Sequence, residues 1–200
     1  MSLDISDLSF HPTPKPGNYF FDTNVWIYVL GVTNGKPFEG TYIDFFNSVY
    51  SIAVNSGTSR IITSSLQISE LFNRLLKIES NKAHLKQSYG KGEYAYYKDV
   101  FRKSAQIVVV FNQFKSDFLA YADAIDVVKC PVSKLEDMLD FSPAVTDFND
   151  NLYISLAKAH EATMVTHDSD LVAQDMKILT LNNTLKKMAK NSVFVKLPKK

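Results

Sequence analysis

Apolar residues follow two different spacings along this chain, and the two spacings alternate from one end to the other. Short runs rich in aromatic and β-branched residues predict strands, at residues 19–22, 60–63, 127–128, 163–167 and 178–181. Longer stretches with apolar residues at three- and four-residue steps predict helices, at residues 25–30, 41–55, 65–78, 93–121, 133–139 and 143–161. Strands that alternate with helices are typical of an α/β fold with a mostly parallel central sheet.

The same pattern predicts one domain between two flanking segments. Residues 1–17 hold three of the seven prolines and are expected to form an irregular lead-in. Residues 18–182 carry the alternating elements, with a helical insertion over about 80–125 that starts in a polar loop. Residues 183–200 are expected to be a basic C-terminal tail. A chain of 200 residues, of which 46% are hydrophobic, is long enough for one sizeable core.

Composition excludes several classes of protein. The 22 basic and 21 acidic residues give a net charge of +1, so the chain is not a strongly basic nucleic-acid coat, and any such contact must use a local patch. A single cysteine, Cys130, excludes an internal disulfide and a thiolate metal cluster, and favours a reducing, cytoplasmic compartment. The N-terminus lacks the pattern of a signal peptide, and no apolar stretch is long enough to span a membrane.

Acidic residues occur where an α/β sheet places its binding sites. Asp22 and Asp168 each close a predicted strand. Glu70 lies in the second turn of a helix that follows a strand directly, and Asp150 lies in the early turns of another helix, one turn after Asp147. The carboxyl ends of parallel strands and the N-termini of the helices meet on one side of the sheet, so these side chains are expected to converge there.

Such a group of carboxylates predicts a divalent-metal site. Gathered carboxylates repel one another unless some are protonated or a cation neutralises them. Oxygen ligands suit Mg²⁺ or Mn²⁺, and such ions support phosphodiester hydrolysis by water without a covalent enzyme intermediate. Ordinary structural roles stay open for each residue: a helix cap for Asp22, a dipole partner for Glu70, helix-start residues for Asp147 and Asp150, and turn formers for Asp168 and Asp170.

Four segments that contain these acidic residues resemble the PIN domain, a nuclease family that includes the VapC-type toxins. They are Phe21–Val25, Ser69–Leu71, Asp147–Ala157 and Val165–Leu171. The resemblance covers most of residues 18–182 in order. It implies a three-layer sandwich of helices around a mostly parallel sheet. It also implies that one or two Mg²⁺ or Mn²⁺ ions are held by Asp22, Glu70, Asp150 and Asp168.

The resemblance implies further roles and partners. Thr23 or Asn24 would support the first carboxylate, and Asp147 or Asp170 would be auxiliary. The substrate would be single-stranded RNA, an antitoxin protein is a candidate partner, and the protein would form a homodimer. His167 is expected to be a structural hydrogen-bonding residue rather than a base.

The chain departs from compact toxins between Glu70 and Asp150, where it is longer by roughly one helical hairpin. This insertion contains aromatic residues and candidate RNA-binding cations, Lys98, Arg102 and Lys103. The alternative interpretation is a stripe of aromatic residues facing the core behind a solvated basic surface. The added length leaves open whether the protein is a toxin or a general RNA-processing enzyme.

The sequence therefore predicts a metal-dependent endoribonuclease, with two alternatives. The first is a phosphatase of the haloacid-dehalogenase type, with Asp22 as nucleophile. That family resembles this chain in an apolar strand ending in Asp, but it usually has a second Asp two residues later, where this chain has Asn24. The second alternative is a catalytically silent RNA-binding or scaffold domain.

Overall fold

The protein is built on a parallel six-stranded sheet. The computed structural model describes residues 3–11, 13–87, 89–131, 134–139 and 147–191. Within them the strand order is β1-β6-β5-β2-β3-β4, and every pair of neighbours is parallel. The strands are β1 (Asp4–Asp7), β2 (Gly17–Phe21), β3 (Ser59–Thr63), β4 (Ile125–Val127), β5 (Thr163–Val165) and β6 (Lys177–Thr180). Five of them lie at the predicted places, with ends that differ from the predicted ones by at most two residues.

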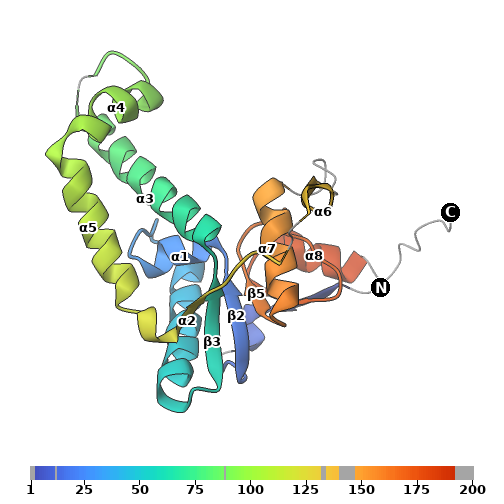
Figure 1. Ribbon diagram of the computed structural model, residues 1–200. Helices are drawn as coiled ribbons and strands as arrows, with labels where there is room; N and C mark the ends of the chain where they lie inside the picture. The colour runs from blue at the N-terminus through green and yellow to red at the C-terminus, as the bar shows by residue number, and fades with distance from the viewer. Residues whose placement is uncertain (1–2, 12, 88, 132–133, 140–146, 192–200) are drawn as a thin grey trace.

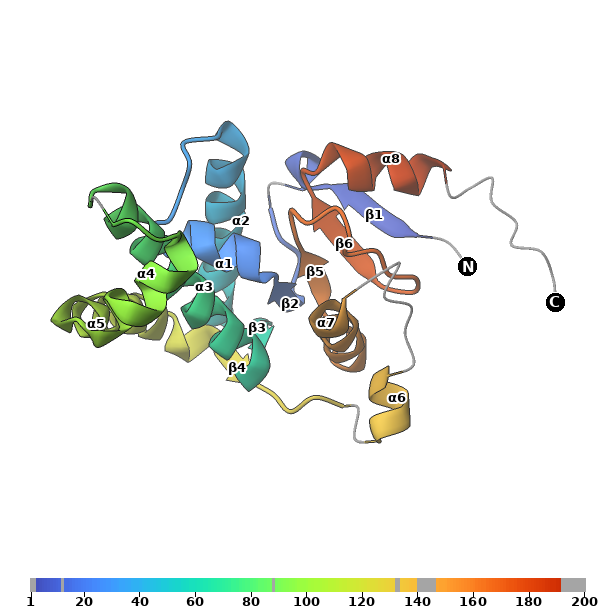
Figure 2. The same ribbon diagram turned by 90° about the horizontal axis from the view of Figure 1, so that it is seen from above.

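Helices cover both faces of this sheet, so the predicted three-layer α/β architecture is confirmed (Figures 1 and 2). The helices are α1 (Thr23–Val29), α2 (Pro37–Ser56), α3 (Ser65–Leu85), α4 (Glu93–Asp99), α5 (Ala105–Leu119), α6 (Leu135–Leu139), α7 (Phe148–Ala159) and α8 (Asn183–Asn191). The helix α2 ends at Gly57, whose φ of 66° is the left-handed conformation that glycine adopts without strain. None of the helices in the described residues is long and apolar enough to cross a membrane.

Strand β2 separates two hydrophobic cores. Tyr19 and Phe21 face a core formed with α1, α2, α3 and α5, in which Trp26 is fully buried. Phe20 faces the opposite side, where Tyr153 and Leu156 of α7 pack against it. Successive strand residues point to opposite faces, so an apolar run on β2 is what a strand buried on both faces requires.

The order in which the chain adds strands to the sheet reverses between β2 and β5. From β2 the chain moves outward through β3 to β4, whereas the later strands β5 and β6 are added on the other side. The carboxyl ends of β2 and β5 therefore border the switch point of the topology. Open α/β sheets bind their ligands at this position.

The insertion forms a helical arm that projects from the sheet layers (Figure 1). Helix α3 runs to Leu85, past the end predicted at 78, so the polar loop expected at 80–92 is shorter. The single helix predicted over 93–121 is divided into α4, a 3₁₀ turn at Phe101–Lys103, and α5. The division has a packing cause, because the turn buries Phe101 with Leu76 and Tyr96 in a separate small core.

Both ends of the chain differ from the prediction. The lead-in at 1–17 was expected to be irregular but contains β1, which pairs with β6 from Asp4↔Lys177 to Asp7↔Thr180. The tail at 183–200 begins with α8, and its residues 192–200 lie outside the described residues, as does the helix start expected at 143.

The described segment that follows Asp168 forms no helical turn. The chain bends there instead, with the Asp170 amide donating to the Asp168 carboxylate at 3.0 Å. Such a turn competes with a helix for the backbone donor.

Candidate active site

Asp22 is buried at the carboxyl end of β2, where α1 begins. Its Oδ1 accepts the Thr23 amide at 2.6 Å, and its Oδ2 accepts the Asn24 side-chain amide at 2.7 Å. The Thr166 hydroxyl also donates to Oδ2, at 2.7 Å. Asp22 therefore caps a helix and is fixed in place by side chains, so the structural and the chemical interpretation of this residue are compatible.

Thr166 connects the first and last acidic residues of the group. Strands β2 and β5 pair through Phe21↔Val165, so Asp22 and Thr166 follow side by side. The Thr166 hydroxyl donates to Asp22 and accepts the Asp168 amide at 2.9 Å. A fully buried hydroxyl thus sets the positions of two carboxylates from distant parts of the chain.

Glu70 is held from across the site by α7. Its Oε2 accepts the Tyr153 hydroxyl at 2.7 Å and the Asn149 amide at 3.2 Å. Tyr153 and Asn149 are four residues apart and lie on one face of α7, so both can reach the same carboxylate. On its own helix, Glu70 makes a longer contact of 3.4 Å with Arg74, which is half exposed.

Asp150 lies in the first turn of α7, above the helix cap formed by Asp147. The Asp147 carboxylate accepts the Asp150 amide at 2.8 Å. Burial, as the largest cause, and the negative charges of Asp147, Asp22, Asp168 and Glu70 together raise the pKa of Asp150 to about 7. The four predicted residues therefore lie close enough together to influence one another electrostatically.

Asp22 shows the same excess of negative charge. Its pKa is raised to about 6, chiefly by burial and also by the charges of Asp168 and Glu70, while hydrogen bonds from Thr166 and Thr23 act in the opposite direction. Two carboxyls with raised pKa values in one site indicate that the protein alone does not neutralise the group.

The chemistry of the group fits a hard divalent cation, but the carboxylates are not clustered around a common point. In the described part of the chain, no group of three or more His, Cys, Asp or Glu side chains is arranged to hold a metal ion. All donors are oxygens, two carboxyls have raised pKa values, and the buried Thr23 hydroxyl beside Asp22 has no hydrogen-bond partner. To bind one cation together, the less buried carboxylates would have to move towards a common point.

His167 belongs to a hydrogen-bond network behind Asp168. The Tyr42 hydroxyl donates to the Thr166 carbonyl at 2.8 Å and accepts the Leu181 amide at 2.7 Å. The single proton of the Tyr42 hydroxyl is thereby used. The hydroxyl oxygen also lies 3.2 Å from His167 Nδ1, so we assign the proton between these two atoms to Nδ1. In neutral His167 this leaves Nε2 unprotonated. The structural role expected for His167 agrees with this geometry.

Sequence reasoning did not identify Thr166, Tyr42, Asn149 or Tyr153 as part of the site. Only the i, i+4 spacing of Asn149 and Tyr153 beside Asp150 offered a signal. The auxiliary candidates are placed as follows: Asn24 contacts Asp22, Asp147 caps α7, and Asp170 is in the turn after Asp168. The arm cations Lys98, Arg102 and Lys103 lie on α4 and the turn after it, away from the group.

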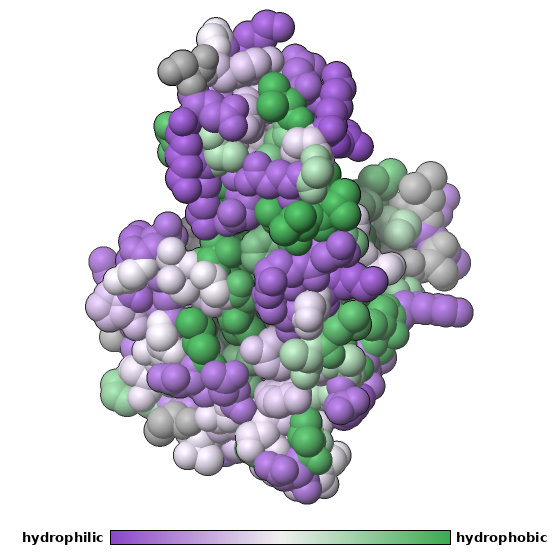
Figure 3. Space-filling view, turned by 90° about the vertical axis from the view of Figure 1, so that its left-hand side faces the viewer, coloured by the Kyte–Doolittle hydropathy of each residue, from purple (hydrophilic) through white to green (hydrophobic). Residues whose placement is uncertain are grey.

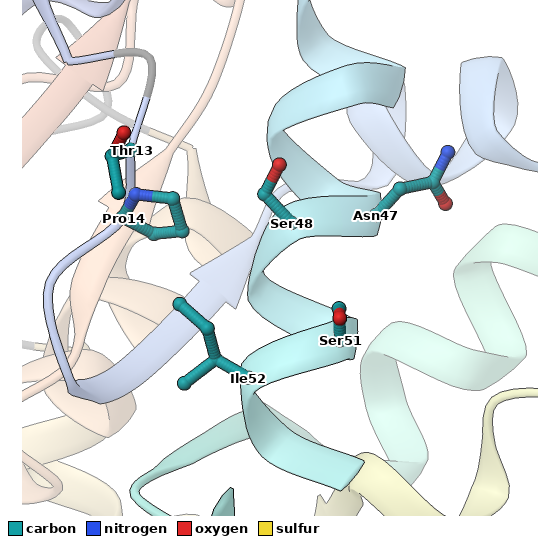
Figure 4. A pocket seen from close by; sticks show the side chains of 6 residues that line it. All are labelled: Thr13, Pro14, Asn47, Ser48, Ser51 and Ile52. Carbon is teal, nitrogen blue, oxygen red and sulfur yellow. The ribbon is translucent and has the colours of Figure 1, made fainter. Parts of the chain in front are cut away.

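A depression with an uncharged lining lies against α2 (Figure 4). Its lining is Thr13, Pro14, Asn47, Ser48, Ser51 and Ile52. None of these side chains is charged, and none belongs to the acidic group. This open depression therefore offers no groups for hydrolysis.

Comparison with known proteins identifies the family of the chain. The PIN domain model matches residues 19–177, which is most of the chain. A chain in the crystal structure of VapBC2 from Rickettsia felis, bound to a DNA fragment from its promoter, is similar at 16% identity and a TM-score of 0.42, over 82% of this chain and 98% of that one. No curated protein matches. The chain belongs to the PIN domain family, whose members are in general nucleases.

Proposed function

We propose that this protein is a metal-dependent endoribonuclease that hydrolyses phosphodiester bonds of single-stranded RNA. The observation that supports this most is electrostatic: the charges of Asp22, Glu70 and Asp168, which come from three other parts of the chain, raise the pKa of Asp150 near the switch point of the sheet. The family supports nuclease chemistry, and the all-oxygen donor set supports Mg²⁺ or Mn²⁺ as the cofactor.

Three of the four carboxylates have separate tasks in this proposal. Asp22 is a fixed ligand because three donors hold it, and Glu70 is aimed by Tyr153 and Asn149. Asp150 has a pKa of about 7, so it can release a proton when a cation approaches and take one up when the cation leaves. A bound divalent cation would neutralise the phosphate and favour ionisation of the attacking water.

The phosphatase alternative is disfavoured by the contacts of Asn24. An acid at this position would have to donate a proton to a leaving group. Here Asn24 donates to the Asp22 carboxylate at 2.7 Å and accepts the His167 amide at 3.2 Å. Asn24 thus positions its neighbours and cannot act as a general acid.

A cleavage assay tests the proposal. Purified protein is incubated with unstructured RNA, single-stranded DNA and a phosphomonoester, each with Mg²⁺, with Mn²⁺ and with EDTA. We expect only RNA to be cut, only with metal, and with a loss of about 10²-fold or more in Asp150→Asn. Asp44→Asn, which removes an exposed carboxyl from α2, is the matched control. Release of phosphate from the monoester would favour the phosphatase, and RNA binding without cleavage would favour the silent domain.

We further propose that the protein acts in the cytoplasm as the toxin of a toxin–antitoxin pair. The negative charge of the site supports this, since an Arg or Lys inserted from an antitoxin would neutralise it. Induction in a bacterial host should arrest growth, and Asp22→Asn should relieve the arrest. Soluble, RNA-cleaving protein that leaves growth unchanged would assign it to general RNA processing.

A homodimer is part of the same proposal. Helix α5 leaves four apolar side chains exposed, and Figure 3 shows apolar surface on this side of the molecule. They are Val108, Val109, Phe111 and Leu119. Exposed apolar surface of this kind favours association. Sedimentation equilibrium should give twice the chain mass, and Val109→Lys should shift it towards the monomer.

A further inference from the structure

Three aromatic side chains lie beside the acidic group. The proposed hydrolysis gives none of them a role. Phe38 stacks on His167 with ring centroids 4.1 Å apart and an interplanar angle of 12°. Tyr28 meets Phe38 edge to face at 6.1 Å. All three rings are only partly buried, and His167 directly precedes Asp168. We call Tyr28, Phe38 and His167 the aromatic shelf.

The loop that carries the shelf to the site is anchored by a buried carboxylate. Glu39 is only 2% exposed, and it accepts the backbone amides of Asn34 at 2.9 Å and Lys36 at 3.1 Å. Gly35 has a φ of 73°, which allows the tight path of this loop. The loop between α1 and α2 is therefore fixed, and with it the position of Lys36.

Two cations border the shelf. The Lys36 ammonium lies 5.7 Å from the centre of the Phe38 ring, and it is near enough to His167 to help lower the pKa of that residue, after the larger effect of burial. Arg74 lies near Tyr28 and contacts Glu70. Two exposed cations thus lie close to the partly buried rings of the shelf, beside a strongly negative centre.

This arrangement matches the chemistry of a single-stranded nucleotide. A base has a flat apolar face that stacks on aromatic rings, and its phosphate pairs with a cation. The acidic carboxylates repel phosphates in the absence of metal, so binding energy must come from groups beside them. We propose that the aromatic shelf and Lys36 form a nucleotide subsite, in which the shelf stacks on a base next to the scissile phosphate and Lys36 holds an adjacent phosphate.

The proposal rests on the proposed ribonuclease function and names the groups that bind its substrate. The competing explanation is that Phe38 and His167 only pack against each other. The chain contains a useful comparison for this, because Lys98 also lies over a ring, that of Tyr94, at 4.7 Å. That pair lies on the arm, far from the acidic group (Figure 1).

Binding measurements separate stacking from charge. The probe is a fluorescent, unstructured eight-nucleotide RNA, with the Asp150→Asn protein used throughout to prevent cleavage. We expect Phe38→Leu to weaken binding by about 5- to 100-fold with an unchanged salt slope, and Phe38→Tyr to restore it. Lys36→Gln should weaken binding and reduce the log–log salt slope by about 0.7. Lys15→Gln, at the opposite end of β2, and Tyr94→Leu should bind as the parent does.

The outcomes distinguish failure of the subsite from failure of the function. If the unsubstituted protein neither cuts nor binds RNA, both proposals fail. If it cuts RNA, and folded Phe38→Leu and Lys36→Gln proteins bind with unchanged affinity and salt slope, the subsite alone is refuted. If thermal unfolding shows that Phe38→Leu does not fold, the comparison of Phe38→Tyr and Lys36→Gln with Lys15→Gln decides the question in the same way.

Discussion

At the scale of single residues, the site depends on hydroxyl groups as much as on carboxylates. The Thr166 hydroxyl has one proton, which goes to Asp22, and its lone pairs receive the Asp168 amide. It can satisfy both partners only while Asp22 accepts. This hydroxyl therefore favours the ionised form of Asp22, against the burial that raises the pKa of that carboxyl.

Replacement of Thr166 by Val should expose this role. The variant has nearly the same shape but removes the donor to Asp22, so the pKa of Asp22 should rise further and the pH at which activity is half-maximal should rise with it. We expect a loss of activity of about 10- to 100-fold near neutral pH, the size expected for a lost hydrogen bond to a charge. Thr166→Ser should retain both effects of the hydroxyl. Equal pH profiles for the Val and Ser proteins would show that Thr166 only fills space.

The raised pKa values of Asp22 and Asp150 also fix how metal-free stability depends on pH. Their folded-state values of about 6 and about 7 lie above the ordinary 3.8, so the folded protein holds these protons more tightly than the unfolded chain does. The resulting stabilisation is fully present below about pH 4 and is lost as the pH rises through 6 and 7. Asp22→Asn should remove part of this slope, and should be more stable than the unsubstituted protein in EDTA at pH 8.

Melting temperatures measured in EDTA and in Mn²⁺ from pH 4 to 8 test this prediction. Mn²⁺ should stabilise the unsubstituted protein most above pH 7, where protons no longer compete for the carboxylates. The metal-induced increase should be smaller in Asp22→Asn and Asp150→Asn than in Asp44→Asn. The same increase in all of these proteins would contradict a metal site made of Asp22 and Asp150.

Sequence alone named the acidic side chains of the candidate site but not the groups that bind them. Asp22 and Asp168 could be identified because they follow apolar strands, and Glu70 because it lies in the second turn of a helix after one. Their partners Thr166 and Tyr153 could not, because each contact joins residues more than eighty positions apart. Hydroxyl and amide donors are common everywhere in a sequence, so only their distance in space gives them meaning.

At the scale of elements, propensity predicted which segments are helical and packing decided where they end. Helix α3 begins with a cap at Ser64, whose hydroxyl accepts the Gln67 amide at 3.2 Å. The Gln67 side chain does not bond back to Ser64. It donates instead to the Phe21 carbonyl at 2.8 Å and accepts the Thr63 hydroxyl. The break at Phe101 is of the same kind, since a tertiary contact there outweighs the local helical pattern.

The arm offers a prediction about its aromatic and basic residues. Tyr96 and Phe101 are buried, as the packing interpretation expects, whereas Lys98, Arg102 and Lys103 are exposed. We expect the triple alanine variant of these three cations to keep its RNA affinity and salt slope, and Phe101→Ala to lose about 3–5 kcal/mol of unfolding free energy. Anisotropy titrations and urea unfolding measure the two. A weaker affinity with a flatter salt slope would instead assign RNA contacts to the arm.

At the scale of the whole molecule, the parallel α/β architecture was predictable but the complete sheet was not. Alternating elements indicate parallel strands wherever they occur. The edge strand β1 was missed because Asp4–Asp7 is short, polar and close to prolines, and its partner β6 lies at the other end of the chain. Nothing local in such a segment indicates a strand, so only the finished sheet shows it.

The strand order has a consequence for dividing the chain. A cut between Lys129 and Cys130, outside helices and strands, leaves Asp22 and Glu70 on one fragment and Asp150 and Asp168 on the other. The first fragment also carries β1, which must cross to β6 of the second, so the fragments would interlock through both β1·β6 and β2·β5. Each half should be inert alone, and co-expression should restore activity. The protein is thus a natural candidate for a split nuclease, whose activity would report that its two halves have associated.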